Sequence, residues 1–169
     1  MKFKAQKSMS AAELVKQLES DPDYVSQRNK QEAQQKEIEV RLRAEETPLL
    51  TALADVGVQV NSVWDLVNSK TDYASAIPVL VKHLRLSYHP KIREGIARAL
   101  TVKQAHGIAG KVILDELKSP KEKNREVRWA LANALSKIAD ASMIDEINAM
   151  IADARYEDVR GILKLALKN

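Results

Sequence analysis

Residues 127–135 read VRWALANAL, and this pattern occurs three times in the chain. Residues 92–100 read IREGIARAL and residues 159–167 read VRGILKLAL, so the copies lie 35 and 32 residues apart. Each copy begins with a β-branched residue and Arg, continues with apolar residues at helical spacing and ends in Ala-Leu. This period is typical of stacked two-helix units. The repeat therefore predicts an all-α fold.

A second helix-like segment precedes each copy. The last apolar residues of these segments, Leu84, Leu117 and Ile151, stand 33 and 34 residues apart. Turn residues follow at 88–90, 118–120 and 154–156. Each unit is therefore predicted to be a helix, a short turn and a second helix. The predicted pairs span residues 72–103, 105–139 and 141–169, after a degenerate first pair at 47–70.

The repeated Ile/Val-Arg element resembles the HEAT-repeat family, in which the second helix carries Val-Arg before an Ala-rich face and the first helix often carries a Pro, here Pro78. The resemblance covers roughly residues 72–169, and the layout is similar to that of small bacterial HEAT-repeat proteins. It implies an α-solenoid. It also implies structural roles for Arg93, Arg128 and Arg160.

The family also places an Asp about six residues before each of these arginines, which implies a ladder of ion pairs between repeats. The matching positions here are Ser87, Glu122 and Ala154, so the sequence departs from that pattern. Glu122 and Asp153 are the candidate substitutes.

Residues 1–46 are predicted to form a polar N-terminal helical arm, and residues 47–169 the repeat domain. A capping box at Ser10 opens a short helix, and Asp21-Pro22 opens a longer one. In the first pair, a helix is expected to begin at Pro48 and to stop at Gly57, and Asn61 is expected to cap the next helix. The arm is interpreted either as a solvated strut or as a helix that docks a partner or forms a homo-oligomer.

Composition limits the classes of function. The chain has no Cys and a formal net charge of only +4, and residues 1–46 carry nine basic and nine acidic residues. No disulfide framework is therefore expected, and a nucleic-acid binder usually has a denser basic face. No secretory signal or membrane-spanning run occurs in the sequence, so we expect a cytoplasmic protein that does not enter a membrane.

The sequence carries no catalytic motif: it lacks a Gly-rich phosphate loop, a nucleophile elbow and a His-Glu-x-x-His element. The three His have no second His or carboxylate at ligand spacing, so no metal site is predicted. We therefore expect a protein that is not an enzyme, with no catalytic residues and no cofactor.

In the HEAT arrangement the second helices line the concave surface, which brings corresponding positions of the three copies onto one strip. Trp129 stands out there, because the matching positions hold Glu94 and Gly161. Trp and Arg are frequent interface anchors. The predicted partner-binding residues are Glu94, Arg98, Trp129, Asn133 and Lys137. The alternative is that Trp129 packs between repeats; Trp64 is assigned to the core.

These observations favour a protein–protein interaction scaffold with an unidentified protein partner. Within this class we consider a toxin-neutralising immunity protein, because small proteins of varied folds fill that role by blocking an active site. The alternative is a nucleic-acid-binding protein that uses the basic turn at residues 118–128. Its candidate contacts to phosphate or to an acidic partner are Lys118, Lys121, Lys123 and Arg125.

Overall fold

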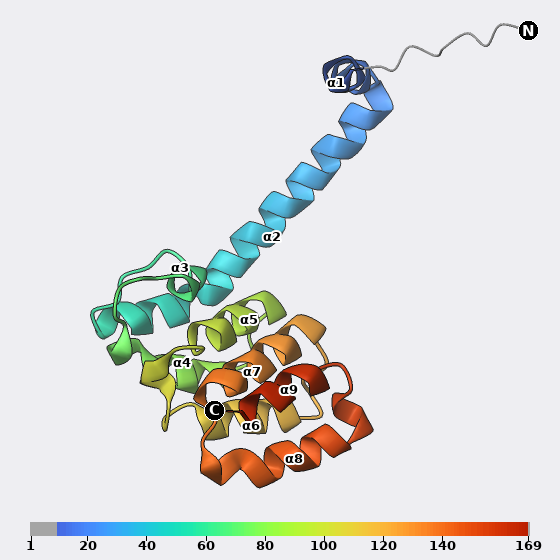
Figure 1. The fold of residues 1–169 in the computed structure, drawn as a ribbon. Coiled ribbons are helices and arrows are strands. Elements are labelled where there is room, and N and C mark those ends of the chain that lie inside the picture. The colour runs from blue at the N-terminus through green and yellow to red at the C-terminus, as the bar shows by residue number, and fades with distance from the viewer. Residues whose placement is uncertain (1–9, 169) are drawn as a thin grey trace, which may run out of the picture. The chain divides into compact units, whose positions relative to one another are not determined.

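The computed structural model describes residues 10–168 of the chain, and within this range it contains helices and no strand (Figure 1). The predicted all-α class is therefore confirmed. The chain divides into two compact units, Met1–Arg41 and Leu42–Asn169. The two units differ in the burial of their side chains: no residue between 10 and 41 is buried, whereas the second unit has a continuous apolar core.

The first unit contains α1 (Ala11–Glu19) and the first part of α2 (Pro22–Asp55). The predicted capping box is present: the Ser10 N–H donates to the Glu13 carboxylate at 2.9 Å, and the Glu13 N–H donates to Ser10 Oγ at 3.3 Å. Hydrogen bonding to the backbone N–H of Ser10, and to a smaller extent to its side chain, favours the charged carboxylate and holds the pKa of Glu13 below its usual value. Asp21 Oδ1 accepts a bond from the N–H of Asp23 at 2.9 Å, which satisfies a free donor at the start of α2.

Helix α2 differs from the sequence prediction at Pro48. No helix begins there, because α2 continues through Pro48 to Asp55. Leu49 and Leu53, in this last part of α2, are completely buried in the core of the second unit, and their burial offsets the hydrogen bond that Pro removes. The predicted stop at Gly57 is confirmed, since Gly57 follows the helix with a φ of 83°.

The next helix also begins later than predicted. Asn61 is not its cap, because α3 spans Trp64–Val67. A buried carboxylate organises the preceding turn: Glu46 accepts hydrogen bonds from the N–H of Val63 at 2.7 Å and from Ser62 Oγ at 3.1 Å. This long-range contact attaches the turn before α3 to the end of α2, and the local sequence pattern gave no sign of it.

Three helix pairs follow, each close to its predicted place. The first pair is α4 (Ile77–Leu84) and α5 (Pro90–Ala99), the second is α6 (Gly110–Lys118) and α7 (Arg125–Ile138), and the third is α8 (Ile144–Ala152) and α9 (Arg160–Ala166). Short 3-10 helices lie in the connections: η1 (Ala74–Ala76), η2 (Lys103–Ala105), η3 (Ala141–Met143) and η4 (Ala154–Tyr156).

The second helices of the pairs form a row. Helix α3 contacts α5, α5 contacts α7, and α7 contacts α9 (Figure 1). Helices α5, α7 and α9 also contact the first helix of their own pair, which is α4, α6 and α8 respectively. Helix α7 lies in the middle of this arrangement. Its Ala130, Ala132 and Ala134 are completely buried together with Leu131 and Leu135. Because alanine side chains are small, the neighbouring helices can approach α7 closely, and each fully buried Leu contributes about 2 kcal/mol.

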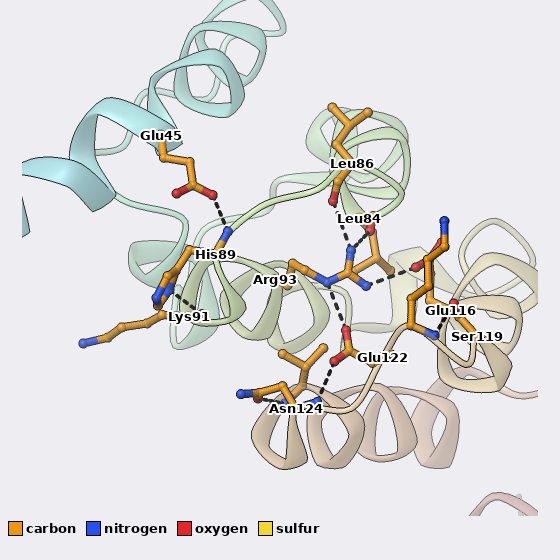
Figure 2. A network of polar contacts seen from close by, with 12 residues as sticks. Glu45, Leu84, Leu86, His89, Lys91, Arg93, Glu116, Ser119, Glu122 and Asn124 are labelled. Carbon is orange, nitrogen blue, oxygen red and sulfur yellow. Dashed lines mark hydrogen bonds and ion pairs between the residues drawn. The ribbon is translucent and has the colours of Figure 1, made fainter. Parts of the chain in front are cut away.

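Arg93, at the start of α5, forms a network of polar contacts between the first two pairs (Figure 2). Its Nη1 donates to the backbone carbonyls of Leu84 at 2.7 Å and Leu86 at 3.0 Å. Its Nη2 donates to Glu116 at 3.0 Å, and its Nε to Glu122 at 3.1 Å. The Arg93 side chain is only 12% exposed. Arg93 therefore joins the end of α4 to α6 and to the turn before α7.

Arg128 repeats this arrangement one pair later. Its Nε and Nη2 donate to the two carboxylate oxygens of Asp158 at 2.8 and 2.9 Å, and Nη2 also donates to the carbonyl of Arg155 at 2.9 Å. The ion pair raises the pKa of Arg128 and lowers that of Asp158. Both arginines thus bind an acid from the following pair, and Glu122 is confirmed as a ladder residue. The prediction for Asp153 is wrong, because Asp153 pairs with Arg155.

The third arginine, Arg160, differs from the other two. Its Nε is buried and has no hydrogen-bond partner among residues 10–168. The three repeated arginines therefore share a sequence position and a place at the start of a helix. Arg93 and Arg128 bind a carboxylate of the next pair, whereas no further pair follows Arg160 within residues 10–168.

Replacing Arg93 by Ala should lower the free energy of unfolding by about 3 kcal/mol, because it leaves two carbonyls and two carboxylates without their donor in a mostly buried place. Arg160→Ala is the matched control and should cost less than about 1 kcal/mol, since it removes no ion pair. Urea denaturation followed by circular dichroism measures both values. Equal losses for the two variants would contradict the structural role of the Arg93 network.

Candidate binding surface

The predicted partner-binding residues belong to two neighbouring helices. Glu94 and Arg98 lie one turn apart on α5, and Trp129, Asn133 and Lys137 lie at successive four-residue steps on α7. Four-residue spacing places side chains on the same face of a helix. None of the five is buried, although their neighbours on the opposite faces of α5 and α7 are. We call the exposed side that carries these residues the α5–α7 face.

Arg98 is the centre of this face. Its guanidinium carbon lies 4.9 Å from the centroid of the Trp129 ring and 5.9 Å from that of the Trp64 ring. Both distances are within the range of attraction between a cation and an aromatic face. Its Nε donates to Glu94 Oε1 at 2.8 Å. We call Trp64, Glu94, Arg98 and Trp129 the arginine–tryptophan cluster.

The cluster brings together three of the five predicted residues. Asn133 and Lys137 follow Trp129 along α7, and their side chains make no hydrogen bond or ion pair within residues 10–168. They therefore extend the α5–α7 face without belonging to the cluster. Trp129 has 39% of its surface exposed, although it contacts Arg98.

Trp64 was assigned to the core from the sequence, and this was only partly correct. It is half-buried and packs against the core on one side, but its ring also contacts Arg98. The reason is Gly95: a Cβ at this position would lie 3.1 Å from Trp64 Nε1 and 2.6 Å from Val63 Cγ1. Only a residue without a side chain lets α3 approach α5 so closely. Gly95, which follows Glu94 in the repeat, is the sequence feature that could have predicted this close approach.

The basic turn holds fewer free cations than its sequence suggests. Lys118, at the end of α6, donates to Glu146 at 2.6 Å, and Lys111 donates to the same carboxylate at 3.0 Å. These two bonds lower the pKa of Glu146. Arg128 is occupied by Asp158. The remaining candidates are exposed and have no carboxylate within 4 Å in the described part of the chain: Lys121, Lys123 and Arg125.

An open groove lies between this turn and the connection before α9. Lys118, Lys123 and Arg125 line one part of it, and Arg155 and Tyr156 line another. Glu122, Glu157 and Asp158 also line the groove. Its lining is therefore of mixed sign, which differs from the uniformly basic surface expected of a site for the phosphate backbone.

Metal-binding and membrane-spanning features are not found in residues 10–168. No group of three or more His, Cys, Asp or Glu side chains there could hold a metal ion. His83 is buried, and its Nδ1 lies 2.8 Å from the hydroxyl of Tyr88. Burial lowers the pKa of His83, with a smaller effect from the neighbouring Lys82. None of the described helices is long and apolar enough to cross a membrane.

Comparison with known proteins adds no relative: no family model, curated protein or solved structure matches the chain.

Gly95→Ala should lower the free energy of unfolding by about 1–2 kcal/mol, because the added Cβ forces α3 away from α5 at the buried Val63. Gly161→Ala is the matched control: its Cβ would meet no atom within 4 Å, and alanine favours helix by up to about 1 kcal/mol. Urea denaturation measures the two effects, which should have opposite signs. Gly95→Ala should also change the tryptophan emission spectrum, since Trp64 must move. A stability unchanged from wild type would contradict the close approach of α3 and α5.

Proposed function

We propose that this chain is a non-catalytic protein-binding scaffold of the HEAT-repeat type, and that it binds another protein through the α5–α7 face. The proposal includes an α-solenoid arrangement of the helix pairs. Two observations support that arrangement: the period of 32 to 35 residues in the sequence and the row of contacts from α3 through α5 and α7 to α9.

The arginine–tryptophan cluster is the observation on which the choice of surface rests. The core of the second unit consists mostly of aliphatic side chains and alanines, with two tyrosines, and it buries neither tryptophan completely. Trp129 is 39% exposed next to a held arginine. Trp and Arg at a shared exposed position are the residue types that most often carry binding energy in protein interfaces. Because Arg98 is already fixed by three neighbours, a partner would lose little entropy in ordering it.

We propose only the class of the partner, which is another protein. A toxin neutralised by this protein is one partner of that class, since a rigid face with an aromatic anchor can cover an active site. Nucleic acid is the alternative partner, and it has weaker support. Two of the cations of the basic turn are engaged by Glu146 and Asp158, and acidic residues line the adjacent groove.

Site-specific crosslinking in cells tests the proposed surface. A photoreactive amino acid at position 133 should form a crosslink to another protein, because Asn133 lies one turn from Trp129 and its side chain is not engaged. Position 108 is the control, since Ile108 is more accessible than Asn133, with 51% exposed, and precedes α6. Crosslinks from both positions with equal yield, or from neither, would contradict the proposed surface. A crosslinked species that disappears on nuclease treatment would favour the nucleic-acid alternative.

Trp129→Ala should weaken the complex with the crosslinked protein at least about 30-fold, since truncation of an interface anchor costs 2 kcal/mol or more. Ile108→Ala should leave the affinity unchanged. Isothermal titration calorimetry with the purified partner measures both, and circular dichroism checks that each variant is folded. Loss of affinity in Ile108→Ala but not in Trp129→Ala would move the interface to the other helix layer.

A further inference from the structure

The guanidinium of Arg98 is only partly used within the chain. Its Nε donates to Glu94, and its guanidinium carbon lies 5.9 Å from the Trp64 ring centroid and 4.9 Å from the Trp129 ring centroid. Its two terminal nitrogens, Nη1 and Nη2, donate no hydrogen bond to any residue between 10 and 168. The Arg98 side chain is 33% exposed. Four N–H donors are therefore held at a fixed place and open to solvent.

The other arginines of the repeat give a direct comparison. Arg93 uses Nε, Nη1 and Nη2 inside the fold, and its side chain is 12% exposed. Arg128 uses Nε and Nη2, and its side chain is 13% exposed. In both cases the acceptors include a carboxylate. Arg98 also binds a carboxylate, that of Glu94, but its outer donors have no acceptor within residues 10–168.

We propose that the outer donors of Arg98 receive a carboxylate from an Asp or Glu side chain of the protein partner. This inference rests on the proposed function and specifies the partner as one that presents an acidic segment to the α5–α7 face. Two parallel N–H bonds from one guanidinium match the two oxygens of a carboxylate. The ion pair with Glu94 and the two neighbouring rings restrict the Arg98 side chain before a partner binds, so ordering this side chain costs less entropy.

Charge favours a carboxylate over a phosphate at this position. Glu94 already neutralises Arg98, since its carboxylate lies 2.8 Å from Nε. One carboxylate adds a single negative charge beside Glu94. A nucleic-acid backbone brings a run of phosphodiesters, each also singly charged, and the α5–α7 face provides few free cations for such a run. The cluster therefore fits an acidic protein segment better than a nucleic acid.

The tryptophans of the cluster provide the assay, because they are the only two in the sequence and both contact Arg98. Tryptophan emission of the full chain is followed during titration with a capped hexaglutamate peptide and, separately, with capped hexaglutamine. Hexaglutamate should change the emission in a saturable way that weakens as salt is added. Hexaglutamine should have no effect. A single-stranded oligonucleotide of equal charge is the third probe and should bind more weakly than hexaglutamate.

Variants assign the effect to Arg98. Arg98→Gln should abolish the response, and Arg98→Lys should weaken it at least fivefold, because lysine retains the charge but not the planar donor pair. Lys82→Gln, at an exposed position of α4 outside both candidate surfaces, is the matched control and should bind as wild type. Where a variant changes the tryptophan emission of the free protein, binding is followed instead by the broadening of the peptide's NMR lines. Circular dichroism confirms that each variant is folded. Wild-type binding by Arg98→Gln, no binding to wild type, or tighter binding of the oligonucleotide would each overturn the assignment.

Binding measurements with the crosslinked partner distinguish a failure of this inference from a failure of the proposed function. If Trp129→Ala weakens the complex and Arg98→Gln does not, the surface stands and the carboxylate assignment is wrong. If hexaglutamate binds through Arg98 but position 133 forms no crosslink to a protein, the carboxylate site stands and the proposed function is wrong.

Discussion

The burial of α7 between its neighbours is the constraint on which the second unit depends. Helix α7 contacts α5, α6 and α9, and its alanines and leucines are completely buried. A helix covered on several sides cannot carry large side chains at every position, so alanine alternates with leucine along VRWALANAL. One face of α7 stays free along its length, and Trp129, Asn133 and Lys137 lie on it.

The same packing explains why the arginines at the helix starts are needed. Each pair ends its first helix with carbonyl groups that have no partner inside that helix. Arg93 satisfies the carbonyls of Leu84 and Leu86 and reaches acids of the next pair at the same time. The ladder therefore satisfies polar groups and fixes the spacing of the pairs. Each ion pair of the ladder joins an arginine to an acid of the following helix pair.

The α5–α7 face follows from this rigid support. Gly95 lets α3 lie against α5, which brings Trp64 close to Arg98, while the row of second helices brings Trp129 close to it as well. Glu94, one turn before Arg98, completes the cluster with an ion pair. A side chain as flexible as arginine is thus held by three neighbours from three helices. Such preorganisation lowers the entropy that binding must overcome.

The sequence alone determined the helical class and the three pairs, because these follow from local periodicity. The choice of Glu94, Arg98 and Trp129 as neighbours on one surface came from the resemblance to HEAT repeats. The predicted helix bounds were wrong where contacts between residues distant in the sequence determine them. Helix α2 continues through Pro48 because Leu49 and Leu53 are buried, and α3 begins late because Glu46 binds the turn before it. The partners of the arginines also depended on packing: Arg128 binds Asp158, not a residue at the family position. Only the tertiary structure brought Trp64 to Arg98. These residues lie 34 positions apart, and they come into contact because Gly95 has no side chain to hold α3 away from α5.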